Sequence, residues 1–245
     1  MKQFLKPAYL PFIVLFTGIV TFSLRLCLFS LGRDQWGLLP EGTIPDILSL
    51  VFVAITLALI GLGVWNLKEE KEYNQNFPAS TIPALGMALA AISFAFSSVM
   101  GFFSQQNSLI SLGNALGLLA AAALFVLAWF RYQGKQPNML LHSLVCVYLM
   151  VYLVSHYQLW SGFPQLQSYA FELLAIVFAM LACYQRAAFD AASGDRRKYS
   201  FFSLAALFFS LAALPSCDDP VFFLGCAVWM FFTPCRMTLP EPKEN

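Results

Sequence analysis

Eight strongly apolar stretches divide this chain of 245 residues, and they constrain its fold more than any motif does. A helix needs about 20 apolar residues to cross a hydrocarbon core of ~30 Å, and shorter stretches cross where the bilayer thins. We therefore predict an all-α integral membrane protein, a bundle of eight transmembrane helices that forms a single domain over residues 1–245. The predicted spans are approximately 8–31, 44–67, 80–103, 108–130, 139–160, 167–189, 199–216 and 220–236.

The composition supports a membrane protein and excludes other classes. Hydrophobic residues make up 59% of the chain and charged residues only 11%, whereas soluble domains are about a quarter charged. The lipid bilayer is thus the expected surrounding. A formal net charge of +1 without a basic stripe excludes a nucleic-acid partner. Only Cys217-Asp218-Asp219 separates the last two stretches, so seven helices plus a re-entrant hairpin is the alternative architecture.

The positive charges predict the orientation in the membrane, because Lys and Arg near span ends mark the cytoplasmic side. With eight spans, twelve of the fourteen basic residues fall on one face, and only Arg25 and Arg33 fall on the other. Both termini are therefore expected in the cytoplasm. The absence of an Asn-x-Ser/Thr sequon fits a cell membrane of bacterial type. The residues assigned to the cytoplasmic face are Lys2, Lys6, Lys68, Lys71, Arg131, Lys135, Arg186, Arg196, Arg197, Lys198, Arg236 and Lys243.

Small residues predict how the helices pack, since helices in lipid associate by close contact between small-residue faces. In the fourth span, Gly113, Gly117 and Ala121 recur every four residues. The gap between the third and fourth spans is only a few residues long. We therefore expect these two spans to form a tight antiparallel hairpin near the centre of the bundle.

Ionisable side chains inside spans are costly and are candidates for function. Arg25 and Glu172 each lie about six residues below the outer end of a predicted span, which is ~9 Å along a helix. Asn114 is predicted at a similar depth, His156 is slightly shallower, and Asp46 lies near the outer end of the second span. The common depth predicts that these side chains converge in the outer half of the membrane.

Polar stripes at helical spacing indicate that these side chains face the interior. Thr17, Thr21 and Arg25 lie four residues apart in succession, as do Tyr152 and His156. Arg25 offers five donors, of which Glu172 occupies about two, so an anionic or zwitterionic ligand finds spare donors. The predicted ligand-binding residues of this outward-facing chamber are Arg25, Glu172, His156, Asn114, Tyr152 and Asp46.

Three functions remain open from the sequence. The first is a transporter or permease-like binder of a small polar or anionic solute in the outer chamber. The second is a structural or accessory subunit, in which Arg25 and Glu172 only lock two helices together and the protein docks to another membrane protein or to a second copy. The third is a haem-binding membrane protein that uses His142 and His156, which lie 14 residues apart on the fifth span.

No motif names a reaction or a known family. The chain lacks His-Glu-x-x-His, Gly-x-Ser-x-Gly and a phosphate-binding Gly-x-x-x-x-Gly-Lys-Ser/Thr loop. The Asp218-Asp219 pair lies in a gap too short to hold a metal alone. The lack of a catalytic motif favours a protein that is not an enzyme, with an intramembrane enzyme left as an alternative beside the haem protein, and we expect no cofactor and no metal site.

Overall fold

The computed structural model describes residues 9–32, 39, 40, 42–67, 73–103, 108–162, 165 and 169–237. In this part of the chain all regular structure is helical, with eight long helices, the four-residue helix α3 and no strand. The prediction of an all-α bundle is confirmed. The helices are α1 (Leu10–Ser30), α2 (Ile44–Trp65), α3 (Tyr73–Asn76), α4 (Thr81–Phe103), α5 (Ser108–Gln133), α6 (Met139–Trp160), α7 (Ala170–Asp190), α8 (Arg196–Ala213) and α9 (Pro220–Met237).

Six of the described helices, α1, α2, α4, α5, α6 and α7, are long and apolar enough to cross a membrane. Helices α8 and α9 have 18 residues each and are therefore ~27 Å long. That length favours two separate helices over the short arms of a re-entrant hairpin. The architecture is that of a multi-pass helical membrane protein.

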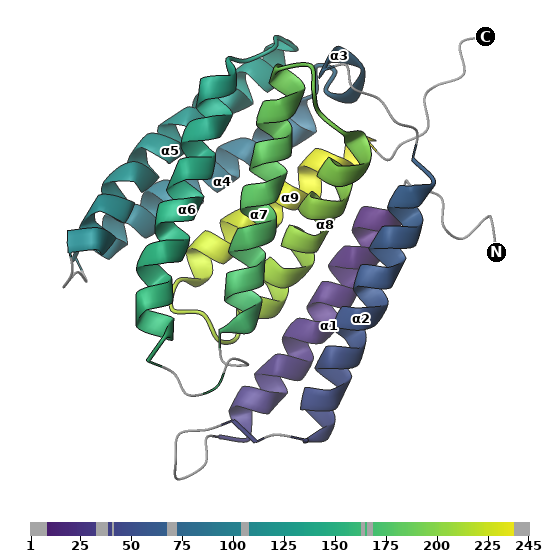
Figure 1. Cartoon of the computed structure of the whole chain (residues 1–245), viewed down its shortest axis with the longest axis vertical. Coiled ribbons are helices and arrows are strands. Elements are labelled where there is room, and N and C mark those ends of the chain that lie inside the picture. The colour runs from purple at the N-terminus through teal and green to yellow at the C-terminus, as the bar shows by residue number, and fades with distance from the viewer. Residues whose placement is uncertain are drawn as a thin grey trace.

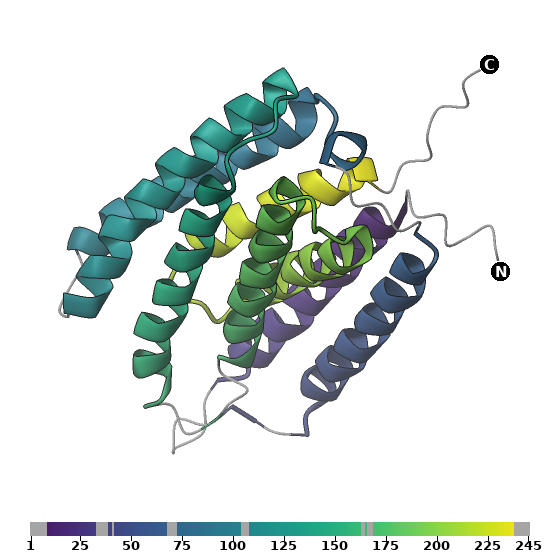
Figure 2. The ribbon, with the colours of Figure 1, turned by 45° about the horizontal axis from the view of Figure 1, so that its top comes forward.

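Helix α8 occupies the centre of the bundle. It packs against α1, α2, α7 and α9, and its middle turns are buried on all sides. The pair α1–α2 forms one edge and the α4–α5 hairpin forms the opposite edge (Figures 1 and 2). The third and fourth predicted spans thus form the expected antiparallel hairpin, but the expectation that this hairpin is central is wrong.

Aspartates begin the last two long helices. Asp195 accepts hydrogen bonds from the backbone N–H groups of Arg197 at 2.9 Å and Lys198 at 3.4 Å. Asp219 accepts from the N–H of Phe222 at 3.1 Å, directly before Pro220 at the first helical position. Both satisfy donors that a helix start leaves unpaired. This capping gives Asp219 a structural role in the gap between α8 and α9.

The two ends of the bundle differ in what they carry. We call the end with α3 the inner end and the end with the turn between α8 and α9 the outer end (Figure 1). The first residues of α1 and the last residues of α9 both lie at the inner end, as an even number of passes requires. Its assignment to the cytoplasm stays a prediction from the charges.

Candidate functional site

At the outer end, the structure places Arg25 of α1 and Glu172 of α7 near Ser216, in the turn after α8. The Nη2 atom of Arg25 donates to the Oγ of Ser216 at 3.1 Å, and the Ser216 hydroxyl donates to the Ala213 carbonyl oxygen at 3.0 Å. The two charges attract each other electrostatically but do not form a direct ion pair within 4 Å. Both side chains are buried, with 0% of Arg25 and 4% of Glu172 exposed.

The Arg25 guanidinium keeps unused donors in this environment. Its carbon lies 3.9 Å from the centre of the Phe171 ring and 5.4 Å from that of Phe29. Its Nε and Nη1 atoms are buried without a hydrogen-bond partner. Asp46 of α2 adds a further negative charge close enough to interact with Arg25. The Arg25 cluster, defined as Arg25, Asp46, Glu172 and Ser216, therefore combines unpaired donors with two acids.

The depth of Glu172 differs from the prediction. Helix α7 begins at Ala170 rather than near residue 167, so Glu172 lies in the first turn. There a negative charge is favoured by the helix dipole and by unpaired backbone N–H groups. Glu172 is therefore less expensive to bury than a carboxylate in the middle of a span.

His156 and Tyr152 form a second group at the outer end. Their rings are stacked with centres 3.8 Å apart, and the ring of Tyr152 lies 4.2 Å from that of Phe222 in α9. The Nδ1 of His156 lies 2.9 Å from the Tyr152 carbonyl oxygen. Asp219 interacts electrostatically with both residues and also accepts a hydrogen bond from Ser97 of α4. This stack fastens α6 to α9.

Asn114 does not join the other predicted residues. Its side-chain amide packs against α4, where a Cβ on Gly101 would lie 2.6 Å from its Oδ1. Helix α5 contacts α4 and α6 and lies far from α1 (Figure 2). The common depth of Asn114 and Arg25 therefore did not imply proximity, because the two helices are at opposite edges of the bundle.

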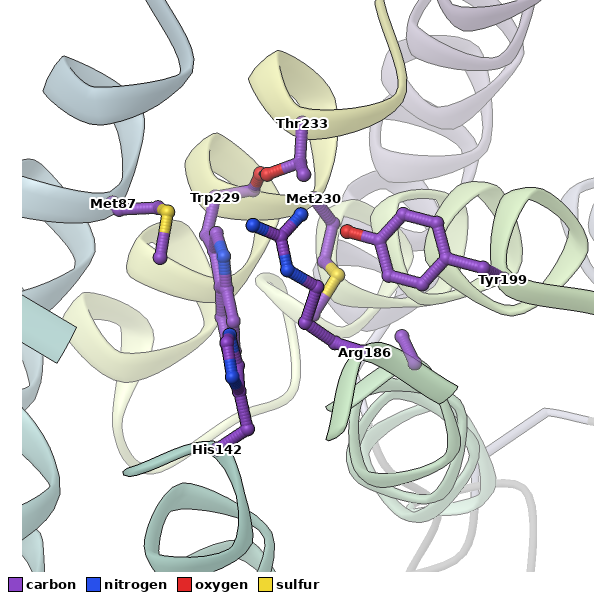
Figure 3. A pocket seen from close by; sticks show the side chains of 8 residues that line it. Met87, His142, Arg186, Tyr199, Trp229, Met230 and Thr233 are labelled. Atoms are coloured by element: carbon purple, nitrogen blue, oxygen red, sulfur yellow. The ribbon is translucent and has the colours of Figure 1, made fainter. Parts of the chain in front are cut away.

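A pocket lies at the inner end of the bundle, among the described residues (Figure 3). Its lining comes from α4, α6, α7, α8 and α9. At every point the walls are too close together to admit a water molecule. The lining residues are Met87, His142, Ala182, Arg186, Tyr199, Trp229, Met230 and Thr233.

Arg186 of α7 reaches into this pocket from a buried position, with 3% of the residue exposed. Its guanidinium carbon lies 3.4 Å from the centre of the Phe77 ring, and its Nη2 atom donates to the Tyr73 hydroxyl at 3.3 Å. The Nε and Nη1 atoms have no partner. Arg131 of α5 lies near the same ring, with its guanidinium carbon 5.3 Å from the centre.

His142 of α6 is completely buried beside Arg186. Its Nδ1 lies 2.6 Å from the Oδ2 atom of Asp190, and both side chains are 1% exposed. A carboxylate only accepts hydrogen bonds, so Nδ1 carries the proton. The other ring nitrogen, Nε2, has no partner. It offers a lone pair at the pocket when the ring is neutral.

The sequence indicated that Arg186 points into the bundle, but we interpreted this residue only as part of the positive charge at the span ends. Arg186 counted as one of many positive charges at the cytoplasmic ends of spans. It follows Ala179 and Cys183 on the same buried face of α7, at spacings of seven and three residues. A cation on a small-residue packing face points into the bundle rather than to the lipid headgroups.

The two histidines lie in different surroundings. His142 lines the inner pocket, and the His156 ring is stacked on Tyr152. The haem alternative stays a prediction.

Comparisons with protein-family models, with curated proteins and with solved structures find no match for this chain. Its class is therefore defined by the fold: a multi-pass, all-helical protein whose apolar helices are compatible with a membrane. Activity has to be argued from its sites.

Proposed function

We propose that this protein is a permease-like binder of a small zwitterionic solute, with the Arg25 cluster as its recognition site. The observation that carries the proposal is the pair of unused nitrogens on a completely buried Arg25. A purely structural arginine is expected to pair its donors, because an unpaired buried polar group costs about 1–3 kcal/mol. A carboxylate on a solute supplies the missing acceptor.

The neighbouring acids favour a zwitterion over a simple anion. Glu172 and Asp46 both lie close enough to interact with Arg25, and Asp218 interacts with Glu172. A solute with a carboxylate and an ammonium group satisfies both signs of charge. A simple anion meets repulsion from the same acids.

A structural or accessory role is the second candidate, and one observation favours it. The Arg25 guanidinium lies 3.9 Å from the Phe171 ring centre, and its Nη2 atom already donates to the Ser216 Oγ. A solute has to displace the Ser216 hydroxyl to reach the guanidinium. In the accessory role the cluster holds α1, α7 and the turn after α8 together without a ligand.

Thermal unfolding of the full-length protein in detergent separates these candidates. Each L-amino acid and glycine betaine is added separately, and a ligand at 100 Kd stabilises the folded state by about 2.7 kcal/mol. We expect at least one of these zwitterions to raise the Tm of the wild type but not of Arg25→Gln. Thr17→Val is the matched control, because Thr17 shares the buried stripe of α1 and its hydroxyl already donates to Val14. An unchanged Tm with every solute contradicts the binding proposal and leaves the accessory role.

A further inference from the structure

We propose that the inner pocket is a second binding site, specific for a small oxyanion that also carries a hydroxyl group. Hydrogenphosphate and phosphomonoesters are the simplest members of that class. This site lies at the opposite end of the bundle from the Arg25 cluster and does not depend on the function proposed above.

The unsatisfied groups of the pocket define the chemistry of the ligand. The Thr233 hydroxyl already donates to the Trp229 carbonyl at 2.8 Å. Among the lining residues, the fully buried nitrogens without a hydrogen-bond partner are Nε and Nη1 of Arg186 and Nε2 of His142. Both residues are more than nine-tenths buried and line the same space (Figure 3).

Arg186 selects an oxyanion. Charge-assisted hydrogen bonds from guanidinium to phosphate or carboxylate oxygens are among the strongest in proteins. The Phe77 ring, 3.4 Å below the guanidinium carbon, and the Tyr73 hydroxyl hold the group in place. The positive charge is thus fixed before a ligand arrives, and its free nitrogens face the pocket.

His142 selects the hydroxyl group. Because Asp190 takes the Nδ1 proton, the neutral ring presents Nε2 as an acceptor. A fully deprotonated anion places a lone pair against that atom, whereas an anion with an O–H group donates to it. Hydrogenphosphate therefore satisfies Arg186 and His142 together.

Two methionines explain how a pocket that is closed to water can accept a ligand. Met87 of α4 and Met230 of α9 both line the pocket; in Figure 3, Met230 is drawn beside Arg186 and Met87 on the other side of Trp229. Methionine is unbranched and has three rotatable side-chain bonds, so it repacks at low cost. Rotation of these side chains widens the space without moving a helix.

Phosphate binding by the full-length protein tests the proposal. Inorganic phosphate is titrated by calorimetry into protein in phosphatidylcholine nanodiscs, with chloride at matched ionic strength as the reference. We expect binding to the wild type that Arg186→Gln weakens by roughly tenfold or more, the loss that follows removal of a charge-assisted hydrogen bond. Lys135→Gln is the control, since it removes an exposed positive charge from the same end of the bundle. The absence of phosphate binding, or equal binding by Arg186→Gln, overturns the proposal.

Two further arms make the result specific. Met87→Ala enlarges the pocket without touching a binding group, so phosphate binding should strengthen or accelerate; this arm remains informative if Arg186→Gln does not fold. An unchanged affinity and rate in Met87→Ala puts the phosphate elsewhere and contradicts the proposal. Loss of binding in Arg25→Gln but not in Arg186→Gln assigns the phosphate to the outer end and also overturns it.

The lipid composition of the nanodiscs distinguishes two sources of the oxyanion, a lipid headgroup and a soluble ion. Phosphatidic acid carries a phosphomonoester headgroup of the proposed chemistry. If nanodiscs that contain phosphatidic acid abolish the phosphate response, the site takes a lipid headgroup. If the response persists there, the site takes a soluble ion, and both results support the oxyanion site.

Discussion

Two buried arginines, one near each end of the bundle, have the same kind of surroundings. Each guanidinium lies over an aromatic ring, Phe171 for Arg25 and Phe77 for Arg186, and each gives one nitrogen to a hydroxyl group. Such contacts stabilise a desolvated cation by ~2 kcal/mol or more. They hold the charge inside the protein but leave other nitrogens available.

The Arg25 cluster is expected to behave as a coupled unit. Arg25→Gln or Glu172→Gln alone leaves a buried charge without compensation, which costs ~3–5 kcal/mol in soluble proteins and less in lipid. Each single substitution should therefore lower the Tm in detergent, and the double substitution should recover part of the loss. The measurement is a double-mutant cycle of thermal unfolding. Strictly additive losses would show that the two charges do not interact.

Sequence reasoning found Arg25 and Glu172 but not Ser216, which accepts a hydrogen bond from Arg25. Depth along a helix follows from counting residues, whereas the side of the bundle on which a helix lies does not. Asn114 shows the same limit. Its depth was predicted from residue counting, but its helix α5 lies at the opposite edge of the bundle from α1. Arg186 was read as a charge at a membrane surface, since lysines and arginines near span ends look alike in sequence whether they point inward or outward.

At the scale of single helices, two glycines of α5 that lie one turn apart, Gly113 and Gly117, differ in how closely neighbouring helices approach them. A Cβ on Gly117 would overlap the Ser98 Oγ in α4 and would lie 2.9 Å from the Tyr148 ring in α6. A Cβ on Gly113 would meet its nearest neighbour, the Ser155 Oγ, at 3.8 Å. Only Gly117 therefore marks a true close approach of three helices.

These contacts predict opposite effects for two similar substitutions. Gly117→Ala should lower the free energy of unfolding by ~1–3 kcal/mol, because neighbouring helices have to move apart. Gly113→Ala should be neutral or raise it by up to ~1 kcal/mol, because alanine favours the helix and fits the space. Thermal or denaturant unfolding in detergent measures both. A larger loss for Gly113→Ala contradicts the packing described above.

The helix boundaries were predictable and the order of the helices in the bundle was not. Six of the eight spans start within two residues of the observed helices, because apolar runs end where polar gaps begin. No comparable feature of the sequence indicated that α8 lies at the centre of the bundle. Lipid is as apolar as a leucine side chain, so hydropathy does not distinguish a lipid-facing helix from a buried one. The ladder of small residues indicated a tight contact but not its place in the molecule.

At the scale of the whole molecule, both ends of the bundle bury charges of both signs. Arg131, Arg186 and the Asp190 side chain are buried at the inner end, and Arg25, Asp46 and Glu172 at the outer end. The prediction that the inner end is cytoplasmic therefore rests on the lysines and arginines near the span ends of the sequence.

Reporter fusions test this orientation directly. Alkaline phosphatase fused after Gln106 or Gln165 should be active, because these positions fall on the predicted outside. A fluorescent protein fused after Gln133 or Asn245 should fluoresce, because those positions fall in the predicted cytoplasm. Phosphatase activity of a fusion at Asn245 would exclude an even number of spans.

The hydrogen bond between Arg25 and Ser216 joins residues that are 191 positions apart in the chain. During synthesis α1 and α2 are made first, so Asp46 is the only acid of the Arg25 cluster that is present early. Glu172 and Ser216 are added much later, and the hydrogen bond of Arg25 to Ser216 therefore forms only when most of the chain has been made. A chain truncated before α7 is expected to expose the Arg25 charge, which long side chains relieve by reaching toward the headgroups.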